Sequence, residues 1–211
     1  MKMLAALFVA VALISPAFAQ KTNPQFTQAI SKLHIVAPAA KPLLLYTGKH
    51  LTPDDKKQFL AAVIKTAPAS ARKHPASPEK ASTITLSTSQ FSQGNAYFVM
   101  NSPFFADIAH NNIYFAGGDA GAINFIIHAQ PNTAYYLAIT IHSDASNPQF
   151  TISTIDDNGK HINPENFTGS TGENEFAYGI VSNSAGDMAV TISSTNALWQ
   201  FYSCVITSST F

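Results

Sequence analysis

Short apolar segments separated by polar turns fill the chain from residue 82 onward. Apolar and polar positions alternate within several of these segments, which is typical of strands with one buried face. Turn-forming clusters at 117–121, 156–159 and 185–187 separate them. The pattern predicts nine strands, at 82–88, 95–100, 112–116, 121–129, 134–142, 148–155, 175–181, 187–193 and 197–207. The intervening polar residues 163–174 are predicted to form a loop.

These strands follow one another without any helical periodicity between them, and this favours two stacked sheets over a parallel sheet. We therefore predict a mainly β fold for residues 83–211. The expected architecture is an antiparallel β-sandwich, Ig-like or jelly-roll-like, preceded by a short two-helix N-terminal segment.

The N-terminal part of the chain carries the helical period instead. Asn23 and Pro24 are typical of a helix start, and Phe26, Ile30 and Leu33 then recur on one helical face. This is the first predicted helix.

A second helix is predicted to begin at Thr52. This residue is a typical cap, and Pro53, Asp54 and Asp55 suit the first turn. An apolar stripe then runs from residue 59 to residue 64. Two short amphipathic helices are rarely stable alone. We therefore expect the two helices of residues 20–65 to pack on each other or on the β domain. The run 43–46 is apolar but fits either type of element.

Residues 66–82 are rich in Ala, Ser and Pro and show no apolar period, which predicts a linker.

At the start of the chain, residues 1–19 resemble a cleavable signal peptide. Lys2 precedes an apolar run from Met3 to Ile14, and Ala17-Phe18-Ala19 has the small-x-small pattern of a cleavage site. The run is shorter than the roughly 20 residues of a membrane-spanning helix. We therefore expect an exported protein, periplasmic or secreted, with no transmembrane span in the mature chain.

Charge is divided unevenly along the chain. Residues 20–80 contain ten Lys and Arg against three acids, whereas residues 81–211 contain nine acids against Lys160 alone. Either the basic segment docks on the acidic β domain, or it contacts an anionic surface such as lipid headgroups.

The single cysteine, Cys204, lies in an apolar run and is expected to be buried and inert. No nucleic-acid partner is predicted.

Segments 121–129 and 134–142 are expected to form a hairpin with both apolar sets facing the core. Its predicted register places His128 opposite Tyr136 and Asn124 opposite Thr140, all on the outer face. With Trp199, these four residues are the predicted ligand-binding residues, because exposed aromatic rings beside polar groups stack on sugars. Burial of Trp199 in the core is the alternative.

Catalytic and metal-binding patterns are weak. No histidine pair has the spacing of a metal motif, so neither a metal site nor a cofactor is predicted. The triplet His142-Ser143-Asp144 has the residue types of a hydrolase triad, but neighbours on a strand point in different directions, and we treat it as coincidental. The turn 156–159 resembles part of a calcium loop without its ligand spacing.

The predicted function is non-catalytic binding of a neutral glycan or a protein partner through a face of the sandwich. One alternative is an envelope-associated structural or assembly protein that uses the basic N-terminal helices. Another is a hydrolase whose site is assembled from loops around His110, His161 and the acids near Asp156. The first is tested by deleting residues 20–65, and the second by asking whether imidazoles and carboxylates converge.

Overall fold

The computed structural model of the chain describes residues 33–69, 82–101, 104–107, 112–115, 121–182 and 186–210. The predicted signal peptide, nearly all of the first predicted helix and residues 70–81 of the predicted linker lie outside these ranges. Within them, no helix has both the length and the apolar character needed to cross a bilayer.

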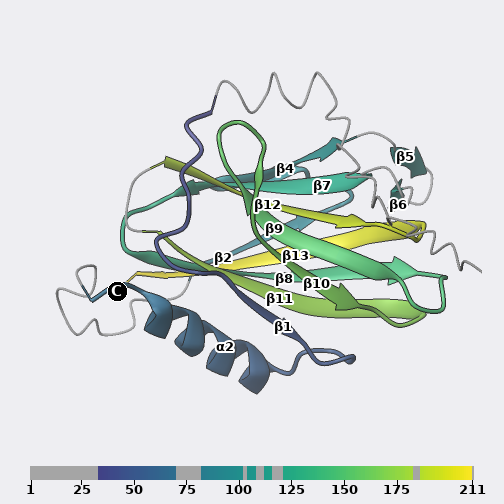
Figure 1. Cartoon of the computed structure of the whole chain (residues 1–211), viewed down its shortest axis with the longest axis horizontal. Coiled ribbons are helices and arrows are strands. Elements are labelled where there is room, and N and C mark those ends of the chain that lie inside the picture. Colours follow the sequence, from purple (N-terminus) through teal and green to yellow (C-terminus); the bar gives the residue numbers. More distant parts are fainter. Residues whose placement is uncertain are drawn as a thin grey trace, which may run out of the picture.

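Two antiparallel sheets stack face to face, as predicted for the β-sandwich (Figure 1). The first sheet has the order β1-β11-β8-β13-β6-β5, and β2 pairs with the second half of β13. Its strands are β1 (Leu43–Tyr46), β2 (Ser82–Ser87), β5 (Phe104–Asp107), β6 (Asn112–Phe115), β8 (Thr133–Ser143), β11 (Gly172–Ser182) and β13 (Trp199–Thr210). We call it the seven-stranded sheet.

The second sheet has the order β10-β9-β12-β7-β4-β3. Its strands are β3 (Ser92–Gln93), β4 (Ala96–Asn101), β7 (Ala122–Ala129), β9 (Gln149–Ile155), β10 (His161–Thr168) and β12 (Gly186–Ser194). We call it the six-stranded sheet.

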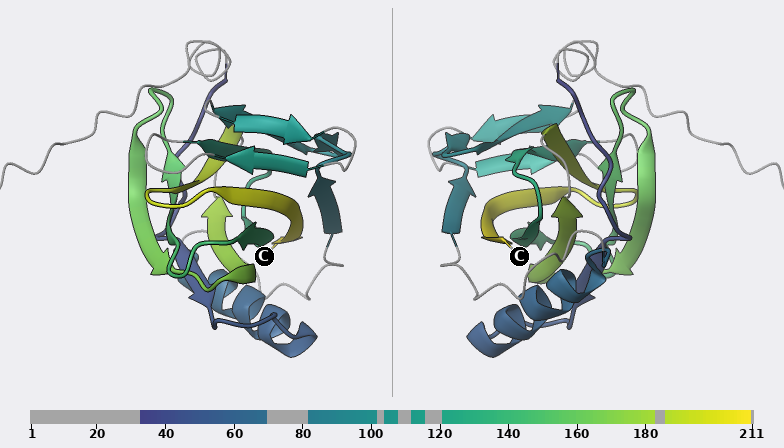
Figure 2. Two further views of the ribbon diagram at one scale, coloured as in Figure 1. Left: turned by 90° about the vertical axis from the view of Figure 1, so that its right-hand side faces the viewer. Right: turned by 90° about the vertical axis from the view of Figure 1, so that its left-hand side faces the viewer.

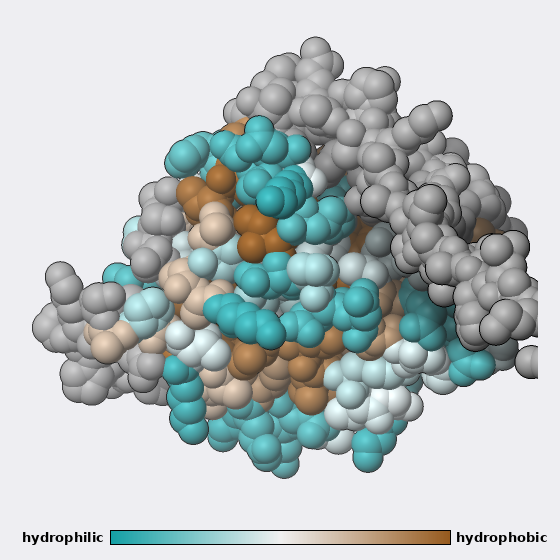
Figure 3. All heavy atoms as spheres, in the orientation of Figure 1, coloured by the Kyte–Doolittle hydropathy of each residue, from teal (hydrophilic) through white to brown (hydrophobic). Residues whose placement is uncertain are grey.

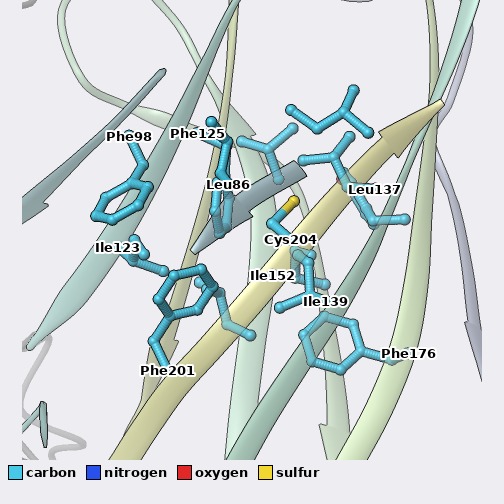
Figure 4. Packing of buried hydrophobic residues seen from close by; sticks show 14 of the residues in the cluster. Leu86, Phe98, Ile123, Phe125, Leu137, Ile139, Ile152, Phe176, Phe201 and Cys204 are labelled. Atoms are coloured by element: carbon cyan, nitrogen blue, oxygen red, sulfur yellow. The ribbon is translucent and has the colours of Figure 1, made fainter. Parts of the chain in front are cut away.

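Alternate residues of both sheets point inward and form one apolar core (Figure 4). Phe125 and Ile152 come from the six-stranded sheet, whereas Leu137 and Phe201 come from the seven-stranded sheet. Cys204 is fully buried among them, as predicted. Burial raises the pKa of its thiol well above the usual value.

The predicted hairpin is wrong, because β7 and β8 belong to different sheets. β7 pairs with β4 and β12, whereas β8 pairs with β11 and β13. The chain between them crosses from one layer to the other, with Asn132 at a positive φ of 51° and the backbone N–H of Gln130 donating to the Tyr135 hydroxyl. His128 therefore lies opposite Asp187, and Tyr136 lies opposite Gly179 and Thr207.

The predicted loop at 163–174 is also largely strand. β10 covers 161–168, and β11 begins at Gly172. β10 is an edge strand whose pairing with β9 is interrupted between Ile162 and Glu165. Asn163 has a φ of 51° there, and the following Pro164 is tolerated because an edge strand can lack a ladder donor. A polar edge strand resembles a loop in the hydrophobic pattern.

The described part of the N-terminal segment packs directly on the sandwich. Ile35 bridges Asp187 in a parallel sense and packs on outward side chains of the six-stranded sheet. The chain then crosses to the other layer, where the N–H of Ala39 donates to the carbonyl of Val181 and β1 pairs with β11. The apolar run 43–46 is therefore a strand, β1, at the edge of the seven-stranded sheet.

The second predicted helix is present as α2 (Pro53–Thr66). Thr52 caps it through a reciprocal pair of hydrogen bonds with Asp55. α2 lies across the outer face of the seven-stranded sheet, on the side away from the other sheet (Figure 2). Its residues Phe59 and Val63 cover Tyr136 and Ala177. Beside it, partly buried apolar side chains gather over β1 (Figure 3).

Candidate functional site

The five predicted ligand-binding residues do not share one surface. Asn124 and His128 are on β7 in the six-stranded sheet, whereas Tyr136 and Thr140 are on β8 in the other sheet. Trp199 is in the core, 1% exposed, where it stacks on Phe115 with ring centroids 4.4 Å apart. Burial is therefore the correct alternative for Trp199.

The other two buried members of the set, Asn124 and Tyr136, also have structural partners. Asn124 is 1% exposed, and its amide donates to the carbonyl of Val99. Tyr136 points outward as predicted but lies under α2, where the ring of Phe59 meets it edge-on at 6.2 Å. Of the predicted residues, His128 is exposed and Thr140 is partly exposed. These two lie on opposite faces of the sandwich.

Thr140 borders a group of polar and aromatic side chains on the outer face of the seven-stranded sheet. We call this group the β8–β13 patch, and its members are His50, His142, Asp144, Glu173 and Tyr202. His142 lies opposite Glu173 on β11, and Thr140 lies opposite Ser203 on β13. Neighbouring strands thus place the patch beyond the N-terminal end of α2.

Two histidine–carboxylate pairs define its geometry. His142 Nε2 is 2.9 Å from Asp144 Oδ1, and His50 Nε2 is 3.4 Å from Glu173 Oε1. The rings of His142 and Tyr202 are nearly parallel, at 25°, with centroids 6.0 Å apart. The Asp144 side chain is 95% exposed and that of Glu173 is 42% exposed. The patch therefore offers aromatic surface beside carboxylates that are open to solvent.

A β-bulge places Tyr202 in this patch. Phe201 pairs with Ile141 and Ser203 pairs with Thr140, so Tyr202 is the extra residue of β13. Tyr202 and Ser203 consequently both face outward, while Phe201 and Cys204 face the core. The sequence itself indicates this bulge, because the buried residues Phe201 and Cys204 are three positions apart instead of two. A prediction that assumes strict alternation along the strand does not detect it.

Glu175 joins the patch to α2. Its carboxylate accepts hydrogen bonds from the N–H of Leu51 at 3.0 Å and from Lys56 Nζ at 2.8 Å, and His50 Nδ1 is 3.3 Å away. Burial raises the pKa of Glu175, but the hydrogen bonds from Lys56 and Leu51 and the charge of Lys56 outweigh it. The pKa is therefore lowered from 4.5. This ionised carboxylate fixes the start of the helix beside the patch.

The hydrolase alternative finds little support among the described residues. Ser143 faces the opposite side of β8 from His142, and its hydroxyl donates to the carbonyl of Leu198. His161 lies within hydrogen-bonding distance of Ser153, and burial lowers its pKa. The Asp156 carboxylate accepts from the N–H groups of its own turn. His110 is outside the described ranges, and within those ranges no group of three His, Cys, Asp or Glu could hold a metal ion.

The charge asymmetry is partly satisfied inside the chain. Lys41 pairs with Glu165 on β10 at 3.1 Å, and Lys56 pairs with Glu175. These two lysines from the basic segment therefore dock on the acidic β domain. Contact of the remaining basic residues with an anionic surface stays a prediction.

Comparison with known proteins gives similarity of fold alone. No family model matches the chain, and no curated protein matches its sequence. Solved structures similar to this chain include a family two carbohydrate esterase from Cellvibrio japonicus, with a TM-score of 0.41 and 10% identity. The alignment covers 61% of this chain but only 34% of the esterase.

Two smaller proteins align over most of their own length. The CBM1 of BiXyn10A is 10% identical, with a TM-score of 0.39 over 59% of this chain and 96% of its own. A family 6 carbohydrate-binding module is 9% identical, with a TM-score of 0.34 over 57% of this chain and 90% of its own. Similarity at this level concerns the β-sandwich.

Proposed function

We propose that this protein is a non-catalytic binding module for uncharged glycans and that it works outside the cytoplasm. The β8–β13 patch is its proposed binding surface. The observation that carries the proposal is the pair of nearly parallel rings, His142 and Tyr202, flanked by the open carboxylates of Asp144 and Glu173.

Sugar rings present two kinds of surface, and the patch has a complement for each. The C–H face of a pyranose is apolar and packs on an aromatic ring such as that of Tyr202. Its hydroxyl groups donate to ionised carboxylates, which form stronger hydrogen bonds than neutral acceptors do. A few placed polar groups beside apolar surface are typical of small-ligand sites.

The charge of the patch favours uncharged glycans over acidic ones. Asp144 and Glu173 are carboxylates, and the nearby Lys56 already pairs with Glu175. Lys160 is the sole Lys or Arg from residue 81 to residue 211. A uronic acid or a sulfated sugar would therefore meet like charge on this face.

Two features argue against catalysis at this patch. Ser143 cannot act with His142, because the two side chains lie on opposite faces of β8. Glycoside hydrolysis commonly requires a carboxylic acid with a raised pKa beside an ionised carboxylate. Glu175, the buried carboxylate that borders the patch, does not meet this requirement, since its pKa is lowered and its oxygens contact Lys56, Leu51 and His50.

Export is part of the proposal because residues 1–19 have the charge, apolar run and cleavage pattern of a signal peptide. A surface that binds neutral polysaccharides is also useful outside the cytoplasm, where such polymers occur.

A glycan array tests the proposal. Purified mature protein, residues 20–211, is applied to uncharged, uronic-acid and sulfated oligosaccharides, alongside Tyr202→Ala and His142→Ala. We expect binding to uncharged oligosaccharides and at least a tenfold loss of affinity in both variants. Phe91→Ala is the matched control, since Phe91 is an exposed aromatic residue, 48% exposed, outside the patch. Absence of binding across the array, or equal binding by Tyr202→Ala, would refute the proposal.

A further inference from the structure

A second aromatic–histidine–carboxylate group lies on the outer face of the six-stranded sheet. We call it the β7–β12 patch, and its members are Tyr97, His128 and Asp187. His128 and Asp187 are directly opposite each other on β7 and β12, and His128 Nδ1 is hydrogen-bonded to the Asp187 carboxylate. Tyr97 projects from β4, the neighbour of β7 on its other side.

This group resembles the first patch in residue types and ring spacing, but its rings are more steeply inclined and the Asp187 side chain is only 14% exposed. The ring centroids of Tyr97 and His128 are 5.7 Å apart at 45°, compared with 6.0 Å for Tyr202 and His142. The His128 side chain is 51% exposed. In each patch, a ring nitrogen of a histidine pairs with a carboxylate: Nδ1 of His128 with Asp187, and Nε2 of His142 with Asp144.

Packed neighbours hold the second group in position. Tyr97 packs with Ile126 and Ala189, over which Ile35 also lies. Burial, followed by the charge of Asp187, raises the pKa of Tyr97, so its hydroxyl stays a neutral hydrogen-bond donor. The N–H of Asp187 donates to the carbonyl of His34, which ties its backbone to the N-terminal segment. A rigid frame of this kind favours a binding site.

We propose that the β7–β12 patch is a second binding site for uncharged glycans, so that one molecule binds two glycan chains at once. The inference takes its ligand class from the proposed function of the β8–β13 patch. The two patches belong to different sheets and to opposite outer faces of the sandwich. A short oligosaccharide therefore cannot bridge them, and each patch takes its own ligand.

Two sites on opposite faces have a physical consequence. A protein that holds two polymer chains cross-links them, and on one dense polysaccharide the second contact forms at a high effective concentration. The avidity for a polymer should then exceed the affinity for a trisaccharide by about 100-fold or more.

Titration of ¹⁵N-labelled protein tests this inference. The probes are uncharged trisaccharides of β-1,4-glucose, β-1,4-xylose, β-1,3-glucose and β-1,4-N-acetylglucosamine, and the readout is the set of backbone amide shifts. We expect two separate groups of shifts, around His128 and Asp187 and around His142 and Glu173. His128→Ala should remove the first group alone, and Tyr202→Ala should remove the second alone. Phe91→Ala should leave both unchanged.

Each outcome separates the two proposals. Shifts confined to the β8–β13 patch would overturn the second site and leave the proposed function intact. Shifts in neither patch, with all four probes, would overturn both. The surviving patch of each variant reports correct folding, and Tyr97→Ala provides a second variant should His128→Ala fail to fold.

Discussion

A single missing side chain permits the close approach of α2 to the sheet. A Cβ atom at Gly179 would lie 2.1 Å from Cγ2 of Val63 and 3.3 Å from the ring of Phe59. Gly179 is not at a positive φ, so the space beneath the helix, rather than the backbone conformation, requires glycine there.

We therefore expect Gly179→Ala to lower the free energy of unfolding by about 1–3 kcal/mol, since overpacking forces the helix to shift. Urea denaturation measures this. Adding Val63→Ala removes the clashing methyl groups, so the double variant should lose less than the sum of the two single losses. Strict additivity would show that the two residues do not compete for this space.

Glu175 gives a second prediction at the residue scale, on pH. Its pKa is lowered in the folded protein, so its contribution to stability is present above the unfolded value near 4.5. That contribution is lost as the pH falls through the lowered folded value. Glu175→Gln should cost about 1–3 kcal/mol at pH 7, because Lys56 and the N–H of Leu51 lose a charged acceptor.

Urea denaturation of the wild type and of Glu175→Gln from pH 3 to pH 7 is the measurement. The difference in stability between the two proteins should shrink as the pH falls below the folded pKa of Glu175. A difference that does not change with pH would contradict the assigned ionisation.

At the scale of elements, alternation located most strands but could not assign partners. Segments 121–129 and 134–142 both have one apolar face, and that pattern fits a hairpin within one sheet as well as a crossing between two sheets. The turn-forming residues 130–133 are compatible with both arrangements. The crossing is determined by long-range pairing, of β7 with β12 and of β8 with β11 and β13. The predicted site failed for this reason, since it assumed one shared face.

The buried position of Tyr136 predicts that Tyr136→Ala lowers stability. Tyr136 is 6% exposed and lies under α2 against Phe59, so truncation leaves a cavity between helix and sheet. The loss of stability should be about 3–5 kcal/mol, as for other large aromatic side chains. Tyr202→Ala is the matched control on the open part of the same face, and it should cost less than about 1 kcal/mol. Similar thermal midpoints for the two variants would contradict the burial of Tyr136.

At the scale of the whole molecule, the sandwich could be predicted because short apolar segments and polar turns repeat along the sequence. Its two-layer core needs only alternating apolar residues, and Phe125, Leu137 and Ile152 all follow that rule. The candidate patches could not be predicted in the same way, because each brings together residues from at least three segments. The His50–Glu173 pair spans 123 positions of sequence, and only the folded arrangement places them 3.4 Å apart.

The continuity of this core gives a prediction for Cys204. The residue is fully buried, so reagents do not reach its thiol. The pKa of the thiol is also raised, so the reactive thiolate does not form. Ellman's reagent should leave the native protein unmodified at pH 8 and titrate one thiol per chain in denaturant. Rapid modification of the native protein would mean that the two sheets separate readily.

The central claim is that the open part of the seven-stranded sheet binds sugar through Tyr202 and His142. A crystal structure of the mature protein with a bound uncharged hexasaccharide tests it most directly. The account predicts a pyranose ring packed on Tyr202, with its hydroxyl groups within hydrogen-bonding distance of Asp144 or Glu173. A sugar bound elsewhere on the molecule, with this patch open to solvent, would contradict it.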